Sequence, residues 1–315
     1  MTAAWTTADI PDQSGRIAIV TGANAGLGYR VALELARKGA RVILTARDPA
    51  RGTAAVERLR AEVPGASAER GDLDLASLAS VQRFAAAVLD RGEGLDLLVN
   101  NAGVMAIPDR QTTADGFERQ LGTNHLGHFA LTGRLLPALL RRPGSRVVTV
   151  SSNNHKLTRS MEFDDLQSER RYSAWNAYAR SKLANAMFVL ELDRRLRNTG
   201  LDVISVGAHP GYARTNLQLS GPRSGGTTLA ARILAAATRV LAQSAERGAV
   251  PVLYAATARE VQGGQYYGPN GLGEQRGRHP KLVAFSAAAR DQAAAARLWS
   301  VSEALTGVRF ASLPG

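Results

Sequence analysis

The sequence contains no cysteine among its 315 residues. Disulfide bonds and thiolate-ligated metal sites are therefore excluded, and a reducing compartment suits the chain. Residues 1–14 hold no apolar stretch of the kind that a secretory signal peptide needs, so we expect a cytoplasmic protein. The longest apolar tract, residues 229–242, carries two arginines and is too short to span a bilayer, so we expect no integral membrane anchor.

Aromatic residues are also few, at 5% of the chain, and no basic cluster is interleaved with them. The formal net charge of +12 comes from basic residues scattered over predicted helix faces, as in 57–60 and 193–197. Surfaces that bind single-stranded nucleic acid combine a basic groove with stacking aromatics. We therefore expect no nucleic-acid partner, although the charge can attract an anionic cofactor or membrane surface weakly.

A glycine-rich turn between a predicted strand and a predicted helix is the most informative feature that is present. Residues 16–21 form a short apolar run typical of a buried parallel strand, and residues 27–38 repeat apolar side chains at helical spacing. Between them, Gly22 allows a tight turn, Gly26 lets a pyrophosphate approach the backbone, and Gly28 lets helix and strand pack closely. The free N–H groups and dipole of the helix then favour phosphate. The turn predicts a dinucleotide-binding βαβ unit.

Short apolar strands alternate with helical patterns along the rest of the chain. The predicted strands are 16–21, 41–46, 67–71, 95–99, 145–151, 202–207 and 264–267. The predicted helices are 27–38, 49–62, 76–91, 116–140, 174–198 and 245–258, with a final alanine-rich helix at 286–307. This alternation predicts an α/β single-domain Rossmann fold, a doubly wound parallel sheet with helices on both faces. We expect residues 1–14 to be a polar lead-in and residues 15–315 to be one domain.

Two polar or glycine-containing segments, 153–173 and 212–244, interrupt the alternation. Long insertions after strand ends lie where open α/β sheets bind ligands. The second insertion has glycine hinges and an apolar face, which suits a lid over an apolar substrate. The alternative is a surface helix that packs on a neighbouring element or a partner subunit.

The end of the second predicted strand distinguishes between the two nicotinamide cofactors. NAD enzymes place an acidic residue here against the ribose 2′-hydroxyl, but this strand ends at Ala46 and is followed by Arg47. A guanidinium is well shaped to bind a 2′-phosphate. Asp48 is expected to cap the helix that begins near Pro49. The sequence therefore predicts NADP(H); the alternative is that Arg47 is a solvated loop residue.

Tyr178 and Lys182 lie at positions i and i+4 of a predicted helix and so share one face. A free tyrosine has a pKa of about 10, and a neighbouring ammonium lowers the pKa by favouring the phenolate. Tyr178 is therefore a candidate general acid/base that Lys182 tunes.

Further polar and glycine motifs follow other predicted strands. They are Asn100-Asn101-Ala102-Gly103, Ser151-Ser152 and His209-Pro210-Gly211, with Thr215 just beyond. The carboxyl ends of parallel strands form the ligand-binding edge of an open α/β sheet, so we expect these motifs to meet there.

Taken in order, these motifs resemble those of the short-chain dehydrogenase/reductase family over residues 15–275. The closer resemblance is to the branch of retinol dehydrogenases, WW-domain oxidoreductase and light-dependent protochlorophyllide reductase. It rests on Thr123–Phe129, Tyr178–Asn185 and His209–Gly211.

The resemblance implies catalytic roles for four positions. Ser152, preferred over Ser151, would hydrogen-bond the substrate carbonyl or hydroxyl. Tyr178 would transfer its proton, and Lys182 would lower the tyrosine pKa and bind the nicotinamide ribose. Asn124 would hold a water molecule that links Lys182 to solvent.

The resemblance also implies a set of cofactor-binding residues. They are Gly22, Asn24, Gly26, Leu27, Gly28, Arg47, Asp72, Leu73, Asn101, Ala102, Gly103, Tyr178, Lys182, Pro210, Gly211 and Thr215. Within this set, Asp72 and Leu73 would lie by the adenine and 101–103 by the adenosine ribose. Residues 210–215 would lie by the nicotinamide amide.

Two departures from the family pattern are visible. The stretch between Ser152 and Tyr178 is longer than in most members, although it is also extended in the retinol dehydrogenase branch. The membrane anchor of several retinol dehydrogenases has no counterpart at this N-terminus. His125 and His128 have a spacing that zinc ligands can show, but no third ligand is evident, so we expect no metal.

We therefore expect an NADP(H)-dependent oxidoreductase that transfers hydride between nicotinamide and a carbonyl or alcohol on an apolar substrate. Reduction is expected in a cytoplasm rich in NADPH. The alternatives are a C=C double-bond reductase, an NADPH-sensing regulator without turnover, and a methyltransferase that uses the same turn for another adenosine ligand. The last leaves Ser152 and the Tyr178–Lys182 pair unexplained. The family often forms homodimers through the helices that carry Asn124 and Tyr178, although insertions can block that face.

Overall fold

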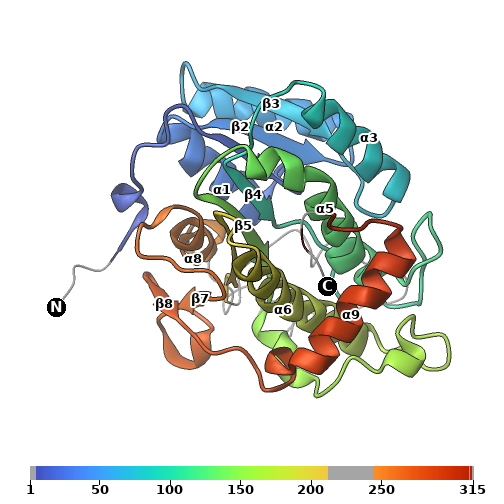
Figure 1. Ribbon diagram of the computed structural model, residues 1–315. Helices are drawn as coiled ribbons and strands as arrows, with labels where there is room; N and C mark the ends of the chain where they lie inside the picture. Colours follow the sequence, from blue (N-terminus) through green and yellow to red (C-terminus); the bar gives the residue numbers. More distant parts are fainter. Residues whose placement is uncertain (1–4, 212–243, 312, 314–315) are drawn as a thin grey trace, which may run out of the picture.

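The computed structural model describes residues 5–211, 244–311 and 313, and its core is one sheet covered on both faces by helices (Figure 1). The strands are β1 (Ile17–Val20), β2 (Arg41–Ala46), β3 (Ala68–Asp72), β4 (Leu97–Asn100), β5 (Ser145–Val150), β6 (Val203–Ala208), β7 (Tyr266–Pro269) and β8 (Pro280–Leu282). They are ordered β3-β2-β1-β4-β5-β6-β7-β8, and every neighbouring pair is parallel except β7 with β8. The sheet is built outward in both directions from β1, so the crevice between β1 and β4 is the topological switch point.

The helices form two layers, one on each face of the sheet. They are α1 (Gly26–Arg37), α2 (Pro49–Glu62), α3 (Leu78–Leu89), α4 (Arg119–Leu121), α5 (Gly127–Leu140), α6 (Ala174–Asn198), α8 (Ala245–Thr257) and α9 (Gln292–Thr306). Successive strand side chains point to opposite faces. Val20 therefore packs in the apolar cluster that includes α1, α2 and α8, while Ile19 packs in the cluster of α3, α5 and α6. Figure 1 shows α8 beside α1, with α5, α6 and α9 on the other side.

The predicted α/β fold and its strand-helix alternation are confirmed, with differences at two elements. Strand β8 was not predicted because it is only three residues long and begins with proline. The helix predicted over 116–140 is interrupted by a π-helical turn at Gly122–Leu126 (η2), which separates α4 from α5. A π-turn adds a residue to the helical path without changing the apolar pattern that predicted the helix.

Local signals at helix ends behave as the sequence indicated. The Asp48 side chain accepts a hydrogen bond from the backbone N–H of Arg51, with Pro49 in the first turn of α2. Gly307 takes a left-handed conformation with φ of 65° and ends α9. The capping residues Asp48 and Gly307 therefore mark the start of α2 and the end of α9 where the sequence predicts them.

The long segment before α6 is held against the protein by a buried arginine. Residues 153–173 form two short 3-10 turns, η3 (Asn153–Leu157) and η4 (Phe163–Asp165). The Arg180 guanidinium donates to Glu162 at 2.8 Å, to the carbonyl oxygen of Asp165 and to the Ser168 hydroxyl. This insertion is thus fixed on α6, directly before the predicted catalytic tyrosine.

Helix α9 packs across α6 and α5 through an aromatic cluster. The Trp299 ring lies 5.1 Å from that of Phe129 and stacks on Phe188 at 6.0 Å, and Phe310 joins the same cluster. The Ser302 hydroxyl lies 2.9 Å from His125 Nε2. Because α9 occupies this side of α5 and α6, a homodimer through those helices, which stays a prediction, would have to form beside it.

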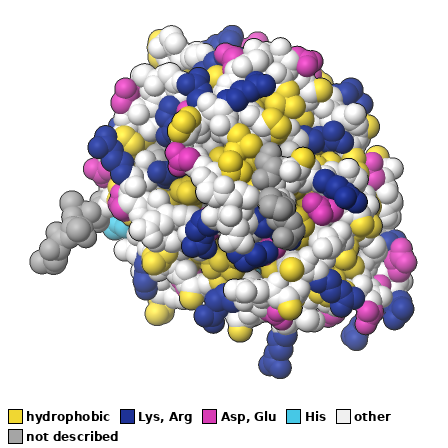
Figure 2. All heavy atoms as spheres, viewed as in Figure 1, with side chains coloured by type: hydrophobic (Ala, Val, Ile, Leu, Met, Phe, Trp, Pro, Cys, Tyr) yellow, Lys and Arg dark blue, Asp and Glu magenta, His cyan; other side chains and the backbone are white. Residues whose placement is uncertain are grey.

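The second predicted insertion lies almost entirely outside the described residues, as do Thr215 and the apolar tract at 229–242. The lid therefore stays a prediction. Among the described helices, none is both long and apolar enough to cross a membrane. On the face shown in Figure 2, lysine and arginine side chains are interspersed with acidic ones and do not gather into one patch.

The buried histidines predict a loss of stability in mild acid. Burial lowers the pKa of His125 to about 3 and that of His128 to about 4, from an ordinary value of 6.5. The unfolded chain therefore binds more protons as the pH drops from 6.5 towards 4, and the free energy of unfolding falls through this window. We expect up to about 1.4 kcal/mol per pH unit from each histidine, measured by urea unfolding at stepped pH.

The control for this prediction is His128→Gln, which removes one titrating group. Its free energy of unfolding should depend less steeply on pH than that of the wild type. Equal slopes for the two proteins would contradict the assignment of a buried, neutral His128.

Candidate active site

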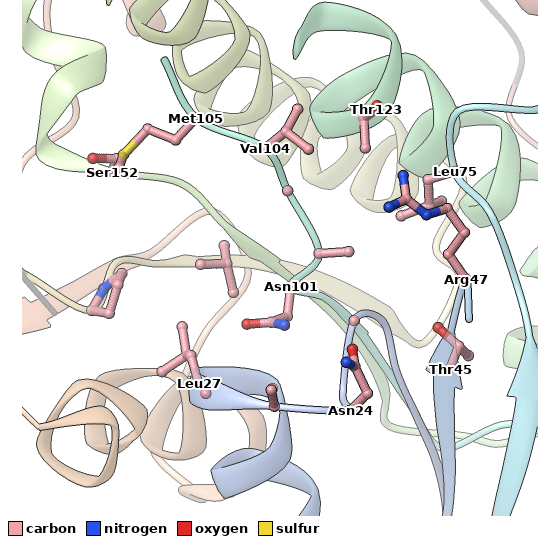
Figure 3. A pocket seen from close by; sticks show the side chains of 18 of the residues that line it. Asn24, Leu27, Thr45, Arg47, Leu75, Asn101, Val104, Met105, Thr123 and Ser152 are labelled. Carbon is pink, nitrogen blue, oxygen red and sulfur yellow. The ribbon is translucent and has the colours of Figure 1, made fainter. Parts of the chain in front are cut away.

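A cavity of about 370 Å³ opens at the carboxyl ends of β1, β2, β4 and β5. Figure 3 shows Arg47 and Asn24 towards one end of this cavity and Met105 and Ser152 at the other, with Asn101 between them. The cavity therefore lies at the topological switch point, where open α/β sheets bind ligands.

The glycine-rich turn leaves its backbone uncovered along one wall of the cavity. Gly22 and Gly26 have φ values of +63° and +58°, in the left-handed region that favours glycine. A Cβ atom on Gly28 would collide with the Asn101 amide and lie 2.6 Å from the carbonyl oxygen of Gly22. Within the described chain, no side chain caps the N-terminus of α1, which begins at Gly26. This arrangement fits a pyrophosphate.

The Thr21 hydroxyl joins this turn to the loop after β4. Its oxygen accepts hydrogen bonds from the backbone N–H groups of Asn101, at 2.8 Å, and Ala102, at 2.9 Å. His128 Nε2 lies 2.8 Å from the same oxygen, and His128 Nδ1 lies 2.9 Å from the Asn124 carbonyl oxygen. Since that carbonyl can only accept, Nδ1 carries the proton and Nε2 accepts from Thr21. A neutral His128 thus connects Thr21 to η2.

The Arg47 end of the cavity is polar and partly exposed. Arg51, one turn into α2, lines it together with Arg47. Two carboxylates also line this end, but both are engaged: Asp48 caps α2 and lies 3.6 Å from the Arg51 guanidinium, and Asp74 accepts from the N–H of Ala76. Within the described residues, Arg47 makes no ion pair, so its guanidinium is available to a ligand.

The opposite end of the cavity brings Ser152, Tyr178 and Lys182 together. Burial raises the pKa of Tyr178 to about 12, although hydrogen bonding by Ser152 opposes the rise. Burial also lowers the pKa of Lys182 to about 8, and its Nζ donates to the Val150 carbonyl oxygen at 3.1 Å. The sequence led us to expect a lowered tyrosine pKa. Here desolvation outweighs the hydrogen bond from Ser152, so Tyr178 holds its proton at neutral pH.

The two serines at the end of β5 have different partners. Ser151 is buried and its hydroxyl donates to the Lys182 carbonyl oxygen at 2.8 Å. The Ser152 oxygen accepts from the N–H of Asn154 at 3.2 Å, and its side chain lines the cavity. Both serines line the cavity, but the Ser151 hydroxyl is bonded to Lys182 while the Ser152 hydroxyl is directed at Tyr178, which agrees with the preference for Ser152 over Ser151.

A family model described as short chain dehydrogenase matches residues 16–221. The chain belongs to this short-chain dehydrogenase family. Its members use nicotinamide cofactors, NAD or NADP. The open space at Gly26 and the uncapped start of α1 fit the pyrophosphate of either cofactor.

Comparison with individual proteins shows to which branch of the family the chain belongs. Retinol dehydrogenase 13 of Homo sapiens is 41% identical over 304 residues, covering 95% of this chain and 87% of that protein. Polyprenol dehydrogenase of Mus musculus is 44% identical over 308 residues, covering 95% of this chain and 86% of that protein. The crystal structure of an uncharacterised protein from Mycobacterium Paratuberculosis is 42% identical, with a TM-score of 0.79, and covers 98% of this chain and 99% of that one. This short-chain dehydrogenase is thus an alcohol or carbonyl oxidoreductase of the retinol dehydrogenase branch.

Most of the predicted site residues of this dehydrogenase line the cavity. They are Gly22, Asn24, Gly26, Leu27, Gly28, Arg47, Leu73, Asn101, Ala102, Gly103, Ser152, Tyr178, Lys182, Pro210 and Gly211. Thr215 lies outside the described residues. The functional roles of these residues stay predictions.

Two of the predicted site residues, Asp72 and Asn124, do not line the cavity. Asp72 is the last residue of β3, and its carboxylate accepts from the Arg70 guanidinium at 2.9 Å. Of the predicted pair, only Leu73 lines the cavity, and Asp74 and Leu75 line it beside Leu73. Asn124 is buried behind the cavity wall. Its amide bonds both the N–H and the carbonyl oxygen of Val104, and this supports the loop that carries Gly103.

The structure adds lining residues that the sequence reading missed. They include Thr45, Arg51, Asp74, Leu75, Val104, Met105, Thr123, Asn154 and Trp175. Two had a usable signal: Arg51 is a second arginine four residues after Arg47, and Trp175 precedes Tyr178 by one turn of α6. The Trp175 ring meets that of Tyr178 edge-on at 6.3 Å and is 57% exposed.

His125 and His128 each bond protein atoms, namely Ser302 for the first, and Thr21 and Asn124 for the second. In the part of the chain that the structure describes, no group of three or more histidine and acidic residues is arranged to hold a metal ion.

Gly28→Ala is expected to weaken dinucleotide binding at least tenfold, because the added methyl group would push Asn101 and the turn apart. Titration of NADPH fluorescence measures this change. Gly65→Ala is the matched control, since Gly65 has a φ of +82° with open space around it and does not line the cavity. It should lose about 1 kcal/mol of stability and bind NADPH normally. Equal binding by both variants would contradict the role of the close approach.

Proposed function

We propose that the protein is an NADP(H)-dependent carbonyl reductase of apolar substrates, working in a reducing, NADPH-rich cytoplasm. One observation carries the proposal: one cavity has the arginines Arg47 and Arg51 at one end and Ser152, Tyr178 and Lys182 at the other. The first group suits a 2′-phosphate, and the second suits proton transfer to a reacting oxygen. Bound nicotinamide would supply the hydride between them.

Carbonyl reduction needs a proton donor, and Tyr178 holds its proton at neutral pH. The hydroxyls of Ser152 and Tyr178 would donate hydrogen bonds to the substrate carbonyl oxygen. As this oxygen gains negative charge, Tyr178 would give it a proton. The Lys182 ammonium, on the same face of α6, would stabilise the tyrosinate left behind. In alcohol oxidation, Tyr178 would accept the proton instead.

The choice of NADP(H) over NAD(H) rests on the end of β2. Arg47 follows β2, and the nearby Asp48 is held by α2 and by Arg51. A 2′-phosphate at this place would gain charge-assisted hydrogen bonds to Arg47 and Arg51. The 2′-hydroxyl of NAD would gain no comparable ion pair.

An apolar substrate is supported by the walls around Ser152. Val104, Met105 and Trp175 line this end, and Trp175 remains more than half exposed beside Tyr178. Two relatives are named for dehydrogenation of retinol and of polyprenol, which are apolar alcohols. Apolar walls with a few polar groups are the usual form of a small-molecule site.

Tyr178→Phe is expected to lower kcat at least 10²-fold with NADPH binding retained, because it removes the proton donor and little volume. NADPH consumption over a panel of aldehydes, ketones, quinones and enones measures the loss, and product analysis separates C=O from C=C reduction. Ser152→Ala should show a smaller loss on the same substrates.

The outcomes of this panel separate the rival functions. A saturated carbonyl product from an enone would favour the C=C reductase. Tight NADPH binding with no turnover of any substrate would favour the sensing regulator. Turnover that survives in Tyr178→Phe would overturn the proton-donor assignment.

Arg47→Asp is expected to weaken NADPH binding roughly 10- to 100-fold and to leave NADH binding within about twofold, since the lost contacts reach only the 2′-phosphate. Dissociation constants for both cofactors measure the change. Arg83→Asp, at an exposed position on α3 that does not line the cavity, controls for the altered net charge. Equal weakening of NADPH and NADH by Arg47→Asp would contradict NADP(H) selectivity.

A further inference from the structure

Two fully buried histidines, His155 and His209, lie just beyond the ends of the adjacent strands β5 and β6. The ring of Tyr266 on β7 lies between them, with its centroid 5.4 Å from that of His155 and 5.3 Å from that of His209. Neither histidine lines the cavity, and neither has a role in the proton transfer proposed above.

His155 connects the catalytic serine to the C-terminal part of the chain. Its Nδ1 lies 2.6 Å from the Ser152 carbonyl oxygen, and its Nε2 accepts from the N–H of Ser286 at 3.1 Å. These partners require a neutral ring with the proton on Nδ1. Burial lowers the pKa of His155 to about 4, in agreement with that state.

His209 makes the corresponding connection at the next strand in the opposite tautomer. Its Nδ1 accepts from the N–H of Gly211 at 3.2 Å, and its Nε2 lies 3.2 Å from a Glu274 carboxylate oxygen. The proton therefore sits on Nε2. Glu274 also binds Lys156 at 2.8 Å, and a Cβ atom on Gly268 would collide with the His209 ring. The ring thus has little freedom to move.

Both histidines bind backbone groups just beyond the last hydrogen bonds between the strands. The last sheet contacts here run from Ser151 N–H to Ala208 O and from His209 N–H to Tyr267 O. Beyond them, the backbone at Ser152 and Gly211 has left the sheet while still lining the cavity. At Gly211 the His209 ring nitrogen accepts from the backbone N–H, and at Ser152 the His155 ring nitrogen binds the carbonyl oxygen alongside the His155 backbone N–H.

We propose that His155 and His209 are positioning residues with separate targets, a proposal that rests on the proposed reductase function. His155 holds Ser152 in register with the reacting carbonyl of the substrate. His209 holds the Pro210-Gly211 corner against the nicotinamide end of the cofactor. Loss of the first should therefore reduce kcat, and loss of the second should weaken cofactor binding.

Asparagine and glutamine form a matched pair of replacements at each histidine. The asparagine amide reaches the place of Nδ1, so it keeps the contact towards the site. The glutamine amide reaches the place of Nε2, so it keeps only the contact towards the C-terminal part. Both are neutral polar side chains, and a merely structural role would not rank Asn above Gln at both positions. Circular dichroism establishes that each variant is folded.

His155→Gln is expected to lower kcat by about 10²-fold with the KM for NADPH unchanged, because a small displacement of Ser152 misaligns the carbonyl. His155→Asn should recover most of this loss. His209→Gln is expected to raise the KM and dissociation constant for NADPH by up to about tenfold with kcat nearly unchanged. His209→Asn should recover wild-type NADPH binding.

Steady-state kinetics and NADPH titration of the wild type and the four variants test the separate roles of His155 and His209. Equal effects of Asn and Gln at a position, or the same shift of kcat and NADPH affinity at both positions, would overturn the proposal. If the wild type binds NADPH but turns over no carbonyl, the reductase function fails. The His209 part is then still decided by the dissociation constants, and the His155 part falls with that function.

Discussion

The close approach of two backbone segments, the turn from Gly22 to Gly28 and the loop at Asn101-Ala102, is the constraint on which the site depends. It brings the ends of β1 and β4 together at the switch point of the sheet. The Thr21 hydroxyl holds the approach by accepting from two backbone N–H groups, and glycine at 28 leaves room for it. Without that contact, the uncovered start of α1 would not face the cavity.

Buried polar groups connect this close approach to the loop at Val104, near the Ser152 end of the cavity. Neutral His128 links Thr21 to the Asn124 carbonyl oxygen in η2, and the Asn124 amide binds both backbone groups of Val104. Asn124 lies in the π-turn between α4 and α5, where π-turns often mark functional sites. The loop that separates the cofactor end from Ser152 is therefore supported from behind over its length.

Burial shifts the pKa values of the two predicted catalytic groups on α6. Desolvation raises the pKa of Tyr178 and lowers that of Lys182, so it opposes the charged form of both. Tyr178 therefore holds its proton at neutral pH, as the proposed role of proton donor requires. The C-terminal part of the chain contributes to this enclosure, since Tyr266, Glu274 and Ser286 all contact residues at the ends of β5 and β6.

The sequence by itself determined the α/β class, the order of the elements and most cavity-lining residues. These depend on apolar periodicity, glycine placement and the rule that parallel strands end at one edge, which are local or topological properties. Tertiary structure alone decided that Asp74, and not Asp72, lines the cavity, since Asp72 is the last residue of β3 while Asp74 lies beyond it. It also decided that burial raises the pKa of Tyr178, and that Arg51 and Trp175 reach the site. Desolvation and contacts between distant segments depend on packing, which no local pattern in the sequence records.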